Sequence, residues 1–370
     1  MAKNIVEIPF TELVERTSEL ARERVDVRGK VRAIVNDVYT REIPRKEDWS
    51  FFLVSSTLTL QQEYNSGTVT ATTGATSVVF SSAASMSSSN TGMKLKISGN
   101  DYPYDVTFLQ TTSLTISPPF SGTTNVSGAS YNLYEPFYSL APDFDRFPKN
   151  GGLINFRGST QEIIPEEAYQ DWNPDYSTST QETPARCRII GTDTAGNAIL
   201  EVNPPPKIAK TLRYDYFIKP KVMRETTAGL IGNISASGTT VTGDGNTLFT
   251  QANTGDYFRI DAFGTSGDSE WYRIIAINGN SSLTIQTAFG LSGATSANYT
   301  ICSAPQMPSK MHPAVLYGSL LQLAADQDDP MVQSYNLKLA EVLSDGKRLY
   351  KTRIYNQDIH NLGEEYMYRR

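Results

Sequence analysis

The sequence predicts an α+β multidomain protein: a discontinuous helical domain with a small antiparallel sheet, carrying two inserted all-β, sandwich-like modules. Three observations predict this class. Two stretches, 64–134 and 232–301, are versions of each other. Helical periodicity is concentrated at the two ends of the chain. A length of 370 residues allows two to four domains.

Residues 1–48 are expected to be helical. The stretch Pro9 to Glu12 is typical of a helix start, with Thr11 as its cap, and Asp26 is a suitable cap for a second helix. The polar faces of these helices mix both signs of charge, which favours a solvated or subunit-facing surface over one that grips DNA. A strand is expected to begin at Trp49.

The two matching stretches share short motifs in the same order. Both open on Ser-Gly-Thr, at 66–68 and 237–239, and both contain Ser-Leu-Thr-Ile, at 113–116 and 282–285. Each has a Phe four positions after that Ile and closes on Ala-x-Tyr-x-hydrophobic. The alternating apolar residues predict short strands joined by polar turns, even where the Ser/Thr/Gly content resembles disorder. A small β unit repeated in this way favours a structural or binding role over catalysis.

Residues 135–231 return to the first domain. They predict strands at 185–190, 197–202 and 212–219. We expect these three strands to form one small antiparallel sheet. Residues 151–164 predict a further strand and then a short helix, which begins near Pro165.

Two helices follow the second module. His312-Pro313 is expected to begin the first, and Asp328-Asp329-Pro330 the second. Gly346 predicts a kink or an end in the second helix. The resulting domains are 1–63, 135–231 and 302–370 for the helical core, and 64–134 and 232–301 for the modules.

Composition excludes several classes of protein. A net charge of −6 argues against a protein that functions by gripping nucleic-acid phosphates. Two distant cysteines, Cys187 and Cys302, exclude a disulfide framework and argue against a zinc site. No secretory signal or membrane span is visible, so we expect assembly in a cytoplasm. We expect no cofactor and no metal.

Catalytic motifs are missing from the sequence. It has two histidines, His312 and His360, and neither a nucleophile elbow nor a phosphate-binding loop. His312 is interpreted as a capping or surface residue. Gly243-Asp244-Gly245 favours a tight turn over a calcium site, because no other carboxylate lies close by. The acids of the second module, Asp261, Asp268 and Glu270, leave glycoside hydrolysis as a minor alternative.

Aromatic residues are the better candidates for a site. Trp271 and Tyr272 are candidate surface aromatics that could stack on a sugar, and a core strand is the competing and favoured interpretation. Tyr102 and Tyr104 align loosely with them and fit a shared core. Trp172 is expected to anchor an irregular loop.

The order of motifs outside the modules resembles the head-to-tail adaptor proteins of tailed bacteriophages. The residues that carry this resemblance are Asn36-Asp37-Val38-Tyr39, the Trp49–Leu53 strand, the strand Leu200–Val202 that ends in prolines, Tyr214-Asp215-Tyr216, and the C-terminal helical pair with Ala324-Ala325-Asp326. The two β modules depart from the smallest adaptors, which are mainly helical.

The resemblance implies a virion neck protein without enzymatic activity. It implies a homo-oligomeric ring, commonly of twelve copies, that joins the portal protein to a tail or nozzle protein and lets genome DNA pass without sequence-specific binding. The family's use of its C-terminal tail suggests portal docking through residues 358–370. The candidate residues are Asp358, Tyr366, Tyr368, Arg369 and Arg370. The modules would decorate the ring or dock tail fibres. The alternative is a carbohydrate-binding, adhesin-type β protein.

Overall fold

The computed structural model describes most of the chain and divides it into two compact units. The described residues are 7–21, 28–100, 102–148, 153–156, 159–163, 184, 186–226, 232–260, 270–290, 294–326 and 330–351. Met1–Phe52 with Lys219–Arg353 forms the first unit, and Leu53–Ile218 is the main part of the second. The division separates the helices from the central strands, which the sequence had placed in one domain. The fold is mixed α+β, as expected.

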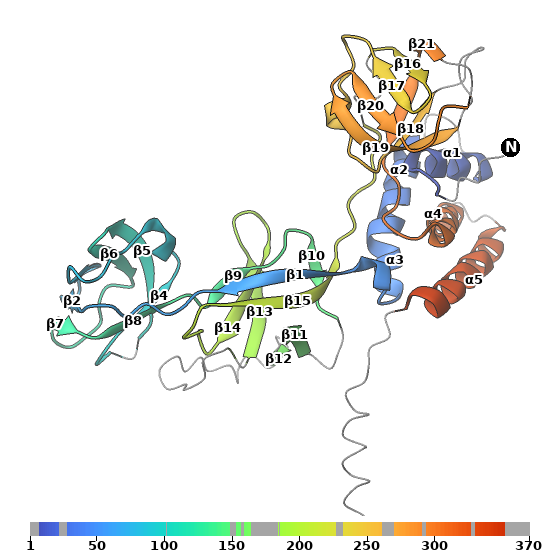
Figure 1. Cartoon of the computed structure of the whole chain (residues 1–370). Coiled ribbons are helices and arrows are strands. Elements are labelled where there is room, and N and C mark those ends of the chain that lie inside the picture. The colour runs from blue at the N-terminus through green and yellow to red at the C-terminus, as the bar shows by residue number, and fades with distance from the viewer. Residues whose placement is uncertain are drawn as a thin grey trace, which may run out of the picture. The chain divides into compact units, whose positions relative to one another are not determined.

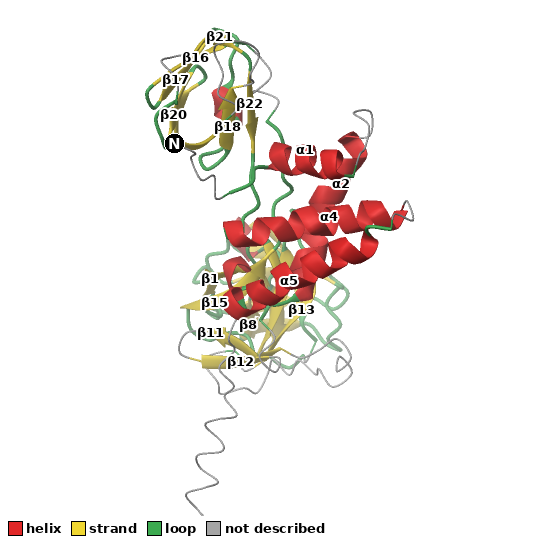
Figure 2. Ribbon diagram, turned by 90° about the vertical axis from the view of Figure 1, so that its right-hand side faces the viewer, coloured by secondary structure: helices red, strands yellow, loops and turns green. Residues whose placement is uncertain are grey.

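The helices of the first unit come from both ends of the chain (Figure 2). They are α1 Phe10–Leu20, α2 Arg28–Asp37, a π-helix Val38–Glu42, α3 Ile43–Lys46, α4 His312–Asp326 and α5 Val332–Tyr350, with short 3₁₀ turns at Ser50–Phe52 and Ser309–Met311. Helix α4 contacts α1, α2 and α5. The two ends of the chain are therefore packed together, which a discontinuous helical domain requires.

A buried histidine fastens the N-terminal segment to the C-terminal helices. The imidazole Nδ1 of His312 accepts a hydrogen bond from the backbone N of Ile8 at 2.7 Å. Its Nε2 lies 3.1 Å from the carbonyl oxygen of Met307, so the proton belongs on Nε2. His312 is fully buried, and burial lowers its pKa. The expectation of a surface or capping histidine was wrong, because the ring lies between the segment that precedes α1 and the segment that precedes α4.

Several helix boundaries differ from those expected. Helix α1 begins at Phe10 because the Pro9 carbonyl accepts the amide of Leu13. Thr11 is therefore no cap; its hydroxyl is buried and donates to Glu225 Oε1 at 2.9 Å. The strand expected from Trp49 begins only after the 3₁₀ turn, at Leu53. The expected caps Asp26, Asp328 and Asp329 lie outside the described residues.

Gly346 neither ends nor breaks α5, which continues to Tyr350. A side chain there would meet the Met311 sulfur and the ring of Trp49, so the glycine allows α5 to approach these residues closely. Trp49 is itself buried and donates from Nε1 to the carbonyl oxygen of Ile43 at 2.8 Å. Leu349, in the last turn of α5, is 52% exposed.

Each repeated stretch forms one seven-stranded antiparallel sheet, and the two sheets have the same strand order. The first contains β2 Val69–Ala71, β3 Ser77–Phe80, β4 Lys94–Ile97, β5 Tyr104–Gln110, β6 Ser113–Ser117, β7 Val126–Ala129 and β8 Tyr131–Tyr134. The second contains β16 Ile234–Ser237, β17 Thr240–Gly243, β18 Tyr257–Ile260, β19 Trp271–Gly279, β20 Ser282–Ile285, β21 Ala294–Ala297 and β22 Tyr299–Cys302. The orders are β7-β2-β3-β6-β5-β4-β8 and β21-β16-β17-β20-β19-β18-β22.

The two edge strands of each sheet are consecutive in the chain. One residue separates β7 from β8, and one separates β21 from β22. A sheet whose opposite edges are joined by a single residue must curl until those edges approach each other. Each module is therefore an open barrel made from one continuous sheet around its own core, rather than the expected sandwich of two sheets (Figure 1).

The strand pairing aligns the two barrels and corrects one motif match. Val78 pairs with Leu114, and Val241 pairs with Leu283, so Val78 and Val241 are equivalent. The first Ser-Gly-Thr precedes β2, whereas the second lies in the turn between β16 and β17. The match between these tripeptides was out of register by one strand. The Ser-Leu-Thr-Ile match is correct, since both copies form the equivalent strands β6 and β20.

The remaining strands form two sheets that share one core in the second unit. One sheet has the order β1-β15-β10, with β1 Leu53–Leu60, β15 Lys210–Ile218 and β10 Phe144–Arg146. The other has the order β11-β12-β13-β14-β9, with β11 Leu153–Phe156, β12 Ser159–Ile163, β13 Arg186–Thr192, β14 Ala198–Asn203 and β9 Phe137–Ser139.

The three central strands expected in one sheet are split between these two. β13 and β14 pair antiparallel, but β15 pairs with β1 along the full length of β1. The short helix expected near residue 164 begins outside the described residues, and the part before it is the hairpin of β11 and β12.

Both barrels have their incoming and outgoing segments side by side. Tyr64 and Leu133 exchange two backbone hydrogen bonds, of 2.7 and 2.9 Å. In the second barrel, Thr226 donates to the Ile301 carbonyl at 2.8 Å, and Ser303 donates to the Arg224 carbonyl at 3.0 Å. Each barrel is thus connected to the rest of its unit by two adjacent segments.

Candidate functional site: a cationic hollow beside the second barrel

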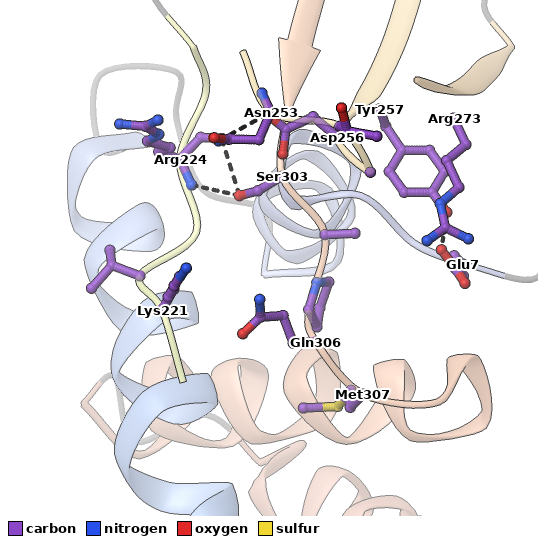
Figure 3. Close-up of a pocket in the computed structure, with 15 residues that line it drawn as sticks. Glu7, Lys221, Arg224, Asn253, Asp256, Tyr257, Arg273, Ser303, Gln306 and Met307 are labelled. Atoms are coloured by element: carbon purple, nitrogen blue, oxygen red, sulfur yellow. Dashed lines mark hydrogen bonds between the residues drawn. The ribbon is translucent and has the colours of Figure 1, made fainter. Parts of the chain in front are cut away.

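The first unit contains a hollow of about 870 Å³ beside the second barrel (Figure 3). Four elements line it: residue Glu7 before α1, the segment 221–224 that leads into the barrel, the barrel residues 253–257 with Arg273, and the segment 303–307 that leads out. The hollow therefore lies where the barrel meets the helical bundle.

Hydrogen bonds fix the two connecting segments that form its walls. The backbone N of Arg224 donates to Ser303 Oγ at 2.9 Å, next to the backbone pair already described. The side chain of Asn36 on α2 bonds both backbone groups of Met223, at 2.8 and 3.0 Å. Glu225 holds Arg32 of α2 at 2.5 Å. These contacts hold the leading segment against the helices.

Cationic side chains dominate the open part of the hollow. Lys221, Arg224 and Arg273 are exposed, and within the described ranges no ion pair or hydrogen bond engages their side chains. The two carboxylates of the lining, in contrast, already accept hydrogen bonds. Glu7 accepts the phenol of Tyr257, and buried Asp256 accepts the backbone N of Asn253 at 2.8 Å. The arrangement suits an anionic ligand.

A second contact, next to the hollow, docks the barrel on α1. Arg259 of β18 makes two hydrogen bonds of 3.1 Å to the carboxylate of Glu15. Its guanidinium also covers the ring of Trp271, 4.5 Å from the ring centroid, and Trp271 donates to Glu12 at 3.3 Å. Planar pairing of this kind fixes orientation as well as position.

The burial of Trp271 and Tyr272 agrees with the favoured core interpretation and excludes the alternative of surface aromatics. Trp271 is only 6% exposed because Arg259 and α1 cover it. Tyr272 is buried in the barrel core, and its hydroxyl accepts the backbone N of Gly290 at 2.9 Å. Neither ring offers a platform for a sugar. In the first barrel, Tyr104 is buried as expected, while Tyr102 is 48% exposed.

The residues of the proposed docking tail lie outside the part of the chain that the structure describes. These are Asp358, Tyr366, Tyr368, Arg369 and Arg370. The same holds for the other unplaced candidates, His360, Trp172, Asp261 and Asp268.

The Gly-Asp-Gly sequence forms a turn, as the sequence predicts. The carboxylate of Asp244 accepts the backbone N of Asn233 and of Asn246, both at 2.9 Å. These bonds lower the pKa of Asp244. Among the residues that the structure places, no group of His, Cys, Asp and Glu is arranged to hold a metal ion.

Both cysteines are buried free thiols. Burial raises the pKa of Cys187 and of Cys302 to about 12, so the reactive thiolate is scarce at neutral pH.

The three cations of the hollow escaped the sequence analysis because Arg273 is distant in the chain from Lys221 and Arg224. One signal was present. The stretch 219–224 contains Lys219, Lys221 and Arg224 with no acidic residue among them. It is a local basic cluster in a chain that is acidic overall. Nothing in the sequence connects it to Arg273, which only the folding of β19 brings near.

Comparison with known proteins identifies no relative. No family model matches the chain, and no curated protein is similar to it. In the described part of the chain, no helix is both long and apolar enough to cross a membrane.

Proposed function

We propose that this chain is a structural protein of the virion neck of a tailed bacteriophage, without enzymatic activity. In this proposal it forms a homo-oligomeric ring, of twelve copies as in the adaptors it resembles. The ring joins the portal to a tail or nozzle protein, and genome DNA passes through it without sequence-specific binding.

One observation carries the proposal. Helices from the two ends of the chain pack into one bundle, with His312 bonded to the backbone of Ile8 across 304 positions of sequence. The order of motifs that resembles the adaptor family lies partly in these helices. Their packing is the arrangement that a single adaptor core, interrupted along the chain, requires.

The barrels fit the role of inserted modules. Both have the same strand order, and both have adjacent incoming and outgoing segments. A unit whose ends are adjacent can be accommodated in a loop of another domain without disturbing it. In the proposed ring they decorate the outside or dock tail fibres and other neck proteins.

The net charge also agrees with the proposal. A chain of charge −6 does not hold DNA by counterion release, and a channel for DNA needs to let it slide. The alternative of a carbohydrate-binding protein is less well supported, because its candidate sugar-stacking residues Trp271 and Tyr272 are buried.

The oligomeric state of the full-length chain is the first test. Light scattering and negative-stain electron microscopy of the purified protein, alone and mixed with the portal protein of the same phage, should show closed rings. A chain that stays monomeric at high concentration, both alone and with the portal protein, would exclude this function.

A further inference from the structure

The hollow and one stretch of the sequence have complementary charge. Residues 164–183 contain five acidic residues and no Lys or Arg. The acids are Glu166, Glu167, Asp171, Asp175 and Glu182. It is thus an acidic segment without a cation of its own.

Within the described residues, no ion pair or hydrogen bond engages the cationic side chains of the hollow. Lys221 and Arg224 lie on the segment that leads into the barrel, and Arg273 lies on the barrel itself (Figure 3). Lys221 and Arg224 lie at one end of the hollow, and Arg273 lies at the other end, beside Glu7 (Figure 3). The carboxylates nearby, Glu7 and Asp256, are engaged by Tyr257 and Asn253. An extended acidic ligand that spans the hollow would therefore meet a cation at each end.

The walls of the hollow also offer backbone groups to an extended chain. Within the described ranges, no hydrogen bond involves Lys221, Val222 or Ala304. Val222 is 66% exposed and adds an apolar contact. Free backbone groups beside an apolar side chain are what an added peptide strand uses. A DNA duplex would meet a carboxylate as well as the three cations, and the site is recessed. The lining therefore favours a peptide over DNA.

We infer that the hollow binds the acidic segment 164–183 of a neighbouring copy of this chain. The inference rests on the proposed ring and names the contact that closes it. Each copy then has one donor segment and one acceptor hollow. Repetition of such a head-to-tail contact produces a closed ring where the rotation between copies closes, and an open helical filament where it does not.

A peptide-binding experiment tests the recognition itself. The probe is a fluorescent peptide of residues 164–183, and the acceptor is a full-length chain whose own five acids are changed to Gln or Asn, so that its segment does not compete. Anisotropy should report saturable binding that weakens as salt is raised. The double variant Lys221→Glu, Arg224→Glu in that acceptor should bind at least about tenfold more weakly.

Two controls make this result specific. Lys338→Glu removes a cation of α5 that lies over Tyr317, outside the hollow, and should leave peptide affinity unchanged. A peptide with all five acids neutralised should not bind. Equal binding of the neutral peptide, or no binding at all, would overturn the inference. So would an oligonucleotide duplex that binds instead and is lost in the same double variant.

A mixing experiment tests the head-to-tail geometry. The chain with a reversed hollow keeps its donor segment, and the chain with a neutralised segment keeps its hollow. Each variant alone should be monomeric by light scattering. Their mixture should form dimers and nothing larger, because one donor and one acceptor remain. Rings formed by either variant alone would refute the inference, as would a segment that binds the hollow of its own chain and leaves the mixture monomeric.

The two proposals fail in different ways. If wild-type rings form but the peptide does not bind, the contact is wrong and the ring stands. If the peptide binds but wild-type chains never associate, the hollow does recognise the acidic segment, and the proposed ring function is wrong.

Discussion

Glu135 is a carboxyl group whose pKa is raised to about 7 in the folded protein. It follows β8, where the chain leaves the first barrel, and it is half-buried. Burial raises the pKa of Glu135 from 4.5 to about 7, against the smaller opposite effect of a hydrogen bond from the backbone N of Phe137. The folded protein therefore prefers this carboxyl protonated.

The sign of the pH dependence follows from that preference. The stabilising contribution of protonated Glu135 is fully present below pH 4.5 and is lost as the pH rises through about 7. Glu135→Gln keeps a neutral side chain at every pH. We expect the variant to be more stable than wild type at pH 8, by about 1–3 kcal/mol, and similar to it below pH 5.

Thermal unfolding of wild type and variant from pH 5 to pH 8 measures this difference. A stability difference between wild type and the Glu135 variant that is constant across the pH range would show that the carboxyl does not titrate as inferred.

At the scale of the element, the two barrels use the same internal hydrogen bond. Tyr104 accepts the backbone N of Ser121 at 3.0 Å, and Tyr272 accepts that of Gly290 at 2.9 Å. Both hydroxyls lie at the same place in the strand order, on β5 and on β19.

Replacing either tyrosine by Phe should destabilise its own barrel by about 1–2 kcal/mol, because a backbone N–H loses its acceptor. Hydrogen exchange by mass spectrometry should show faster exchange in the altered barrel and no change in the other. Faster exchange in both barrels would mean that they do not unfold independently.

Glycines in the helices provide a second matched pair. Gly346→Ala places a methyl group against Met311 and Trp49 and should destabilise the contact of α5 by about 1–3 kcal/mol. Gly29→Ala in α2 meets nothing within 4 Å and should stabilise its helix by about 0.5–1 kcal/mol. Hydrogen exchange of α5 and α2 measures each effect locally. Equal protection of α5 in wild type and Gly346→Ala would contradict the close approach.

For the whole molecule, the first barrel should be dispensable for assembly. The backbone pair of Tyr64 and Leu133 holds the ends of the barrel at the distance of neighbouring strands. Replacing residues 65–132 with two glycines should therefore leave ring formation unchanged in light scattering and electron microscopy. Failure of this chain to assemble, while remaining folded by circular dichroism, would contradict a peripheral role.

Local patterns in the sequence predicted local structure well. Alternation and turn residues identified strands such as β6 and β20, and helical periodicity identified the helices at both ends. The Ser-Gly-Thr match misled, because a short polar motif suits the start of a strand and a hairpin turn equally. Partners in a sheet also escaped prediction, as for β15, which pairs with distant β1 instead of β14.

The candidate site was not predictable in the same way. Arg273 and Lys221 line the same hollow only because the folded chain places β19 beside the connecting segments. No local pattern in the sequence encodes that proximity. The interpretation of Trp271 depended equally on a distant element, since α1 supplies the acids that hold Arg259 over its ring. Sequence periodicity indicates which face of a helix or strand is apolar. It does not indicate which other element covers that face.

The paired segments at the base of the first barrel also define a path for mechanical force. Tension along the chain reaches Tyr64 on one side and Leu133 on the other, and the two backbone bonds between them carry it directly. The curled sheet beyond that clamp bears no load until the clamp breaks. A pull on the rest of the unit would therefore leave the barrel folded until these two bonds break.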